Sequence, residues 1–181
     1  MIKIIQVAFL AIFCFNIARS EFNFTTCPTF YEIQADKVAT DFDRNKLVGT
    51  YYELALHDYT QYPTCLRPSC IRSQKEFTEV GDGKSQIKDT FTLSCFGAPY
   101  VTSYYFNFTE NNGSLDGFLV DPPIWWKILF QEEYPDTIVD FKESEDGAQY
   151  DWVIEFQCRE KDPIIGGKKV GFTGFNFYSR I

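Results

Sequence analysis

Histidine and methionine are almost missing from this sequence, which has one of each among 181 residues. The single histidine, His57, cannot complete a usual zinc ligand set, and Cys65 and Cys70 have no second cysteine pair beside them. A cysteine nucleophile would need a neighbouring base, and His57 is the sole candidate. We therefore expect no metal site, no cysteine catalysis and no cofactor.

Positive charge is also scarce. The 17 Lys and Arg residues are outnumbered by 25 Asp and Glu residues, so the net charge is −8 and the pI is about 4.7. The cations do not gather into one stripe, as they do in proteins that neutralise nucleic-acid phosphates. We expect no nucleic-acid partner, and we assign most of the acidity to solubility.

Only one long apolar run is present, at residues 4–15. Lys3 precedes this run and Ala18-Arg19-Ser20 follows it, with small residues at the positions that specify cleavage, which predicts a secretory signal peptide over residues 1–20. The run is too short for a membrane helix, which needs ~20 apolar residues. No repeat or linker divides the rest. We expect one domain over residues 21–181, secreted to the extracellular space and without a membrane span.

A secreted chain meets oxidising conditions, so disulfides are the default for the cysteines that follow Cys14. Their number is odd, so one thiol stays unassigned. Three Asn-x-Ser/Thr sequons begin at Asn23, Asn107 and Asn112. In a secreted chain these sequons predict glycosylated surface positions.

Aromatic residues are abundant, with 19 Phe and 11 Tyr, and suit the half-buried faces of a β-sheet. From Cys70 onward, strand-like segments alternate with turn signals, as in an up-and-down barrel or a sandwich. We count eight strands. The run Trp125–Phe130 either extends the fifth strand or lies across a rim of the barrel.

The turn Gly81-Asp82-Gly83 fixes a predicted register for the hairpin around it. Its expected cross-strand pairs are Phe77 with Ile87, Lys75 with Asp89 and Ile71 with Leu93. A disulfide between Cys70 and Cys95 is our second choice of pairing. A direct pair of Cys70 with Cys95 requires a register shifted by one residue from the one that the turn predicts. A β-bulge must therefore lie between the turn and this pair if both predictions hold.

Period-two alternation predicts which side chains face the interior. In residues 152–158 the even positions are apolar and most odd positions are polar. In the strand that contains Asn107, a glycosylated Asn107 must face solvent, so the even-numbered residues on either side of it face the interior. The predicted ligand-facing residues are Phe91, Leu93, Tyr104, Phe106, Phe108, Trp152, Ile154 and Phe156. An eight-stranded barrel is either filled by such side chains or holds one small ligand, and the sequence leaves both open.

Two stretches carry a family resemblance. Lys46–Leu56 resembles the Gly-x-Trp-Tyr-Glu entry strand of the lipocalins, with Gly49 in place and Tyr51 where the family has tryptophan. The last strand resembles the lipocalin closing strand, which ends in an arginine laid across that aromatic, here Arg180. The resemblance implies an all-β fold, an eight-stranded antiparallel up-and-down barrel with a short N-terminal helical segment, and a barrel floor formed by Gly49, Tyr51 and Arg180.

Two branches of the family are similar to this chain. The segment Trp152–Cys158 resembles the strand of apolipoprotein D-like lipocalins whose last cysteine ties down the N-terminal segment, which implies a disulfide between Cys27 and Cys158. The region of Cys65 and the closing strand resemble the lipocalin domain of violaxanthin de-epoxidase. With Cys27 joined to Cys158 and Cys70 joined to Cys95, Cys65 is the thiol left without a partner.

The resemblance implies a secreted lipocalin that binds and carries a small hydrophobic ligand, such as a fatty acid, retinoid, steroid or carotenoid. An alternative is a violaxanthin de-epoxidase-like or isomerase-type enzyme acting on a lipid held in the barrel. Such an enzyme needs a carboxylic acid near the cavity, and Glu53, with His57 farther along the strand, is the candidate. A third interpretation is a packed barrel that faces a cell-surface receptor.

Overall fold

The computed structural model of the chain describes residues 27–58, 68–80, 84–95, 97–120, 133–159, 164–165, 168–169 and 172–180. The expected signal peptide, the sequon at Asn23 and the run Trp125–Phe130 lie outside these ranges. Within them, no helix has the length and apolar character needed to cross a membrane.

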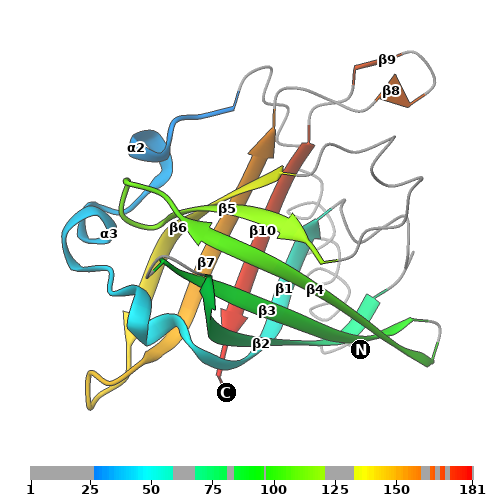
Figure 1. Cartoon of the computed structure of the whole chain (residues 1–181), viewed down its shortest axis with the longest axis horizontal. Coiled ribbons are helices and arrows are strands. Elements are labelled where there is room, and N and C mark those ends of the chain that lie inside the picture. The colour runs from blue at the N-terminus through cyan, green and yellow to red at the C-terminus, as the bar shows by residue number, and fades with distance from the viewer. Residues whose placement is uncertain are drawn as a thin grey trace, which may run out of the picture.

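Eight strands close into an antiparallel barrel (Figure 1). Each strand pairs with the next one along the chain, and β10 returns to pair with β1 and completes the circle. This topology confirms the predicted eight-stranded up-and-down, lipocalin-like fold. The barrel strands are β1 Gly49–Asp58, β2 Pro68–Val80, β3 Lys84–Cys95, β4 Ala98–Phe108, β5 Ser114–Leu119, β6 Glu133–Glu143, β7 Tyr150–Arg159 and β10 Phe172–Ser179; β8 Ile164–Ile165 and β9 Lys168–Lys169 pair separately.

The β2–β3 hairpin has the register that its turn predicts, with Lys75 opposite Asp89 and Phe77 opposite Ile87. A bulge between Ser69 and Arg72 then shifts the pairing before Ile71 reaches its expected partner. The strain of this bulge falls on one cysteine, because Cys70 has a positive φ of 53°.

The bulge explains why the predicted disulfide between Cys70 and Cys95 is wrong. It places Pro68, rather than Cys70, opposite Cys95. The thiol of Cys70 is exposed and free. Cys95 belongs to a disulfide whose other half lies outside the described residues. Cys70 is thus a thiol without a disulfide, whereas Cys65, the cysteine expected to lack a partner, lies outside the described residues.

A short helical segment leads into the barrel and lies beside β6 in Figure 1. It comprises α2 Phe30–Ile33, α3 Asp36–Asp41 and the 3-10 helix η1 Arg44–Leu47. The backbone N–H of Ala35 donates to the carbonyl of Val139 on β6 (2.8 Å). Ahead of the helices, a disulfide joins Cys27 to Cys158 with 5.6 Å between the Cα atoms. The disulfide that the apolipoprotein D resemblance implies is thus confirmed.

The faces of β3 and β4 are oriented as the alternation predicts. Phe91, Leu93 and Phe106 are buried, and the register puts Tyr104 and Phe108 on the same interior face, where they are partly buried. The solvent-facing position expected for the intervening sequon is also observed, because Asn107 is exposed.

The face of β7 is the reverse of the prediction. Val153, Glu155 and Gln157 are buried, whereas Trp152, Ile154 and Phe156 lie on the outer face and are partly exposed. Alternation separates two faces but does not say which one is interior. Neighbours on the outer surface cover part of this apolar face. The Trp152 ring lies 5.8 Å from that of Phe177 on the adjacent strand β10, and Phe156 lines an outer pocket of about 380 Å³ against the N-terminal segment.

Candidate functional site

One end of the barrel is closed by an arginine over a tyrosine, and we call it the covered end. The guanidinium carbon of Arg180 lies 4.4 Å from the ring centroid of Tyr51. Arg180 Nε donates to the carbonyl of Tyr150 (2.7 Å) and Nη2 to the hydroxyl of Tyr51 (3.0 Å). Gly49 has a φ of +126°, and a Cβ at that position would lie 2.3 Å from Arg180 Nη1. The floor therefore requires glycine here, for its conformation and for its lack of a side chain.

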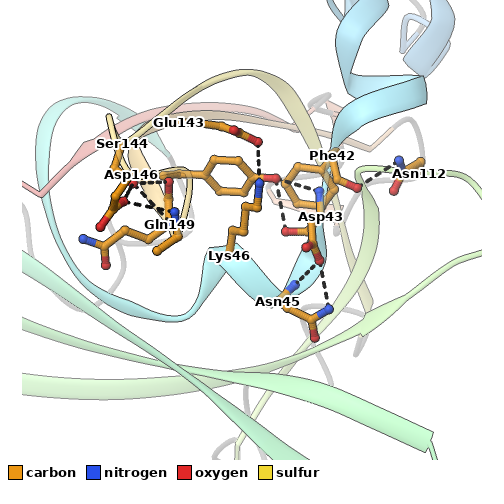
Figure 2. Close-up of polar contacts among 11 residues, drawn as sticks. Phe42, Asp43, Asn45, Lys46, Asn112, Glu143, Ser144, Asp146 and Gln149 are labelled. Atoms are coloured by element: carbon orange, nitrogen blue, oxygen red, sulfur yellow. Dashed lines mark hydrogen bonds and ion pairs between the residues drawn. The ribbon is translucent and has the colours of Figure 1, made fainter.

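The helical segment is tied to the covered end by polar contacts, which Figure 2 shows around Asp43 and Lys46. The hydroxyl of Tyr150 accepts from the backbone N–H of Asp43 (2.6 Å) and donates to its carbonyl (3.1 Å). Lys46 Nζ lies 2.7 Å from Glu143 Oε1, and the ring of Phe42 stacks on that of Tyr150. These contacts pair the polar groups that the segment presents to the barrel.

Asn112 also belongs to the covered end (Figure 2). Its Nδ2 atom donates to the carbonyls of Val38 and Phe42, each at 3.1 Å, and so caps the end of α3. An N-linked glycan is attached through this same nitrogen. The contacts therefore compete with glycosylation at Asn112, although Asn112 is exposed, as is Asn107 on the outer face of β4.

The middle of the barrel holds a buried ionic cluster, which we call the interior layer. Lys75 on β2 is 3% exposed and forms ion pairs with Asp89 on β3 and with Glu155 on β7 (3.0 Å). Ser73 Oγ donates to Asp89 Oδ1 (2.7 Å). Because β7 is not a neighbour of β2 in the barrel, the Lys75 side chain reaches across the interior and links the two walls.

Aromatic rings surround the ammonium of Lys75. Its Nζ atom lies 4.7 Å from the ring centroid of Tyr178, 5.9 Å from that of Phe106 and 6.0 Å from that of Phe91. Burial acts to lower the pKa of Lys75, but the nearby carboxylates of Asp89 and Glu155 outweigh burial and raise it. Lys75 is therefore a permanent cation of the barrel interior.

Asp136 on β6 adds a further carboxyl to the interior layer. It is 2% exposed, lies against Glu155, and accepts a long hydrogen bond from Gln157 Nε2 (3.4 Å). Burial and the charge of Glu155 raise the pKa of Asp136 well above its ordinary value. Burial also raises the pKa of Glu155, against the opposing effect of Lys75. Asp136 and Glu155 therefore titrate as a coupled pair, in which each carboxyl keeps its proton to a higher pH than it would in solvent.

Two buried acceptor atoms of this layer receive no hydrogen bond in the structure. They are Asp136 Oδ1 and Gln157 Oε1, on neighbouring strands at directly paired positions. Burying an acceptor without a donor costs about 1–3 kcal/mol. Such an arrangement in a native fold calls for an explanation, and a ligand donor is one.

Glu53 connects the interior layer to the covered end. With the Asn176 carboxamide oriented so that its nitrogen faces acceptors, it donates to Glu53 Oε1 (2.8 Å), and the Tyr178 hydroxyl donates to its oxygen (3.3 Å). Glu53, the carboxylate expected for an enzyme, is thus held by a neighbouring amide. The side chain of His57, its expected companion, lies outside the described residues.

Sequence reasoning missed the polar half of this site. The members that it did not assign to the interior are Lys75, Asp89, Asp136, Glu155 and Gln157. A signal for the first two was present, because Asp89 stands two residues before Phe91 and opposite Lys75, so a buried Phe91 implies a buried ion pair. For β7 no such signal existed, since its apolar residues fit the interior equally well.

No family model matches the chain, and no curated protein matches it. Among solved structures, the chain is similar to the siderocalin Ex-FABP, a protein described as functioning through dual ligand specificities. The two are 12% identical, with a TM-score of 0.47 over 75% of this chain and 74% of that one.

Proposed function

We propose that this protein is a secreted carrier of the lipocalin type that holds one small hydrophobic ligand inside its barrel. The proposal rests on the partial exposure of side chains on the interior face of β4. Thr102 and Tyr104 share the interior face with the buried Phe106 but remain partly exposed, although their partners Phe91 and Asp89 are buried. Solvent that reaches these interior positions supports a barrel with internal space rather than a solid core.

The chemistry of the β3 and β4 walls favours an apolar ligand body. Phe91, Leu93, Tyr104 and Phe106 present rings and a branched aliphatic side chain to the interior. Burying a ligand against them contributes ~25 cal/mol per Å² of apolar surface, before the costs of ordering. Fatty acids, retinoids, steroids and carotenoids all offer such a surface.

Secretion, glycosylation and a receptor complete the proposal. The expected signal peptide supports export, and the exposed side chain of Asn107 supports a glycan at that position. A receptor is expected to contact the outer face of β1 and β10, where Tyr52, Leu54 and Phe175 are 47%, 58% and 39% exposed. Mass spectrometry of protein secreted from eukaryotic cells tests the cleavage site and the glycan together.

A ligand displacement assay tests the central claim. The fluorophore N-phenyl-1-naphthylamine should bind the protein and be displaced by retinol and by 1-dodecanol. Thr102→Trp fills the interior and is expected to abolish binding. The matched control is Val101→Trp on the next residue, which points outward and is 59% exposed, and should leave binding unchanged.

The proposal fails if the folded wild-type protein binds neither the fluorophore nor the ligands. Equal binding by the Thr102→Trp and Val101→Trp variants would also contradict it, because the ligand would then lie outside the barrel. Circular dichroism of both variants establishes that each retains the β fold.

A further inference from the structure

The polar groups of β6 and β7 offer acceptors to the barrel interior without matching donors. Asp136 is 2% exposed, Glu155 2% and Gln157 7%, and all three face inward. Neither Asp136 Oδ1 nor Gln157 Oε1 accepts a hydrogen bond in the structure. The site is therefore built for a partner that donates hydrogen bonds.

Charge within the interior layer is also unbalanced toward the negative. Asp89, Asp136 and Glu155 are buried carboxyls, and Lys75 is the one buried cation among the described residues. Lys75 forms ion pairs with Asp89 and Glu155. Asp136 has no ion pair of its own, so a second cation placed beside it would complete the pairing.

Two glycines face the interior at this level of the barrel. Gly174 on β10 is the direct partner of Gln157, and it is buried, in alternation with the interior residues Asn176 and Tyr178. On the other side, Gly117 of β5 is buried two residues after the interior Leu115, which is the partner of Asp136. Glycines inside a strand often mark places where a ligand approaches the sheet closely.

The position of these residues in the barrel favours access by a ligand from the end opposite the covered end. Asp136, Gln157 and Gly174 lie within three residues of those ends of β6, β7 and β10 that are farthest from the covered end. A ligand entering from that side meets these residues before it reaches Lys75. Its apolar part would then lie along the aromatic wall of β3 and β4.

We propose that the barrel binds a lipophilic primary amine, whose ammonium donates hydrogen bonds to Asp136 and Gln157. This inference rests on the proposed function and names the chemistry of the ligand's head group. The three N–H donors of the ammonium suit the acceptors Asp136 Oδ1 and Gln157 Oε1, which otherwise lack partners. A fatty acid would instead bring another negative charge beside Asp136 and Glu155.

Three probes of equal chain length separate the possibilities: dodecylamine, 1-dodecanol and dodecanoate. Each is titrated into the full-length protein below its micelle-forming concentration, with displacement of N-phenyl-1-naphthylamine as the readout. We expect dodecylamine to bind at least about 30-fold more tightly than dodecanoate, the ratio typical of one buried charge pair.

Asp136→Asn should weaken dodecylamine binding by about 30-fold or more and leave 1-dodecanol binding within about twofold. Asp116→Asn is the matched control, because Asp116 is exposed on the outer face of the adjacent strand β5. Gln157→Met removes an acceptor without changing any charge, and should weaken amine binding by about 3- to 10-fold. Unchanged 1-dodecanol binding shows that each variant is folded.

The outcomes divide the two proposals. If 1-dodecanol and dodecanoate bind and dodecylamine binds no better than dodecanoate, the amine inference is wrong and the carrier function stands. Tight amine binding that Asp136→Asn leaves unchanged also overturns the inference, since the head group then lies elsewhere. Binding of none of the three probes to folded protein overturns both proposals.

Discussion

The covered end and the interior layer both place polar groups against buried residues of the barrel, yet they are built differently. At the covered end, Arg180 spreads its donors over carbonyls and the Tyr51 hydroxyl, and Tyr150 both donates to and accepts from Asp43. In the interior layer, carboxyls outnumber cations, and the acceptor atoms Asp136 Oδ1 and Gln157 Oε1 lack donors.

Under our proposal, this difference separates a structural site from a binding site. A buried group with a neutral partner at hydrogen-bond distance stabilises the fold and needs nothing else. A buried group that lacks a partner raises the free energy of the folded protein until a ligand supplies one. Ligand binding should therefore stabilise the protein through the interior layer and leave the covered end unchanged.

The largest effect is expected from Lys75→Met, which removes the cation on which the interior layer depends. Asp89 and Glu155 would stay buried without a positive partner, so the free energy of unfolding should fall by about 3–5 kcal/mol. Urea unfolding at neutral pH measures the change. Lys142→Met is the control, because its side chain is 61% exposed and its pairing with Asp151 contributes less than about 1 kcal/mol. Equal losses in the two variants would contradict a buried ionic cluster.

At the covered end, Arg180→Lys should lower the free energy of unfolding by about 1–2 kcal/mol. Lysine keeps the charge but loses the plane over the Tyr51 ring and the forked donors that reach Tyr150 and Tyr51. Thermal unfolding gives the measurement, with Arg72→Lys on an exposed position of β2 as the matched control. If both exchanges leave the melting temperature unchanged, Arg180 does not hold the floor.

The pH dependence of stability should distinguish the two regions. Folding raises the pKa of Asp136 above its ordinary 3.8, so at higher pH the folded chain holds a proton that the unfolded chain has lost. Stability then falls as pH rises from that ordinary value to the raised one, by at most about 1.4 kcal/mol per pH unit.

The asparagine in Asp136→Asn cannot ionise, so this variant should not show the fall in stability. Its free energy of unfolding, compared with that of the wild type, should therefore increase with pH. Urea unfolding measured at intervals from about pH 4 to about pH 8 tests it. Arg180→Lys is the control, because it should shift the whole curve without changing its slope. Parallel curves for wild type and Asp136→Asn would show that Asp136 does not titrate as inferred.

The smallest effect is expected at Asn112, in protein made without glycosylation. Asn112→Asp replaces the Nδ2 donor with an oxygen facing the carbonyls of Val38 and Phe42, and should cost about 1 kcal/mol. The same exchange at the exposed Asn107 should have no measurable effect. Chemical denaturation of the two variants side by side makes the comparison. A larger loss at Asn107 would mean that Asn112 does not hold the helical segment to the barrel.

Local patterns in the sequence were enough to predict several features of the fold. The turn signal in the sequence predicted the register of Lys75 against Asp89, which the strands adopt, because a short loop fixes the pairing of its strands. The order of the motifs around Gly49 and Arg180 matched a closed barrel, and the chain does close, from β10 to β1. The pairing of Cys27 with Cys158 followed from the same resemblance.

The sequence alone thus determined the strands, their order and the groups that alternate along them, since these depend on spacing of neighbours in the chain. Only the tertiary structure decided which face of β7 looks inward. Glu155 and Gln157 occupy the interior because Lys75 and Asp136, far away in sequence, lie opposite them. A buried charge is stable only where its partner is also placed, and the closure of the barrel is what brings those partners together.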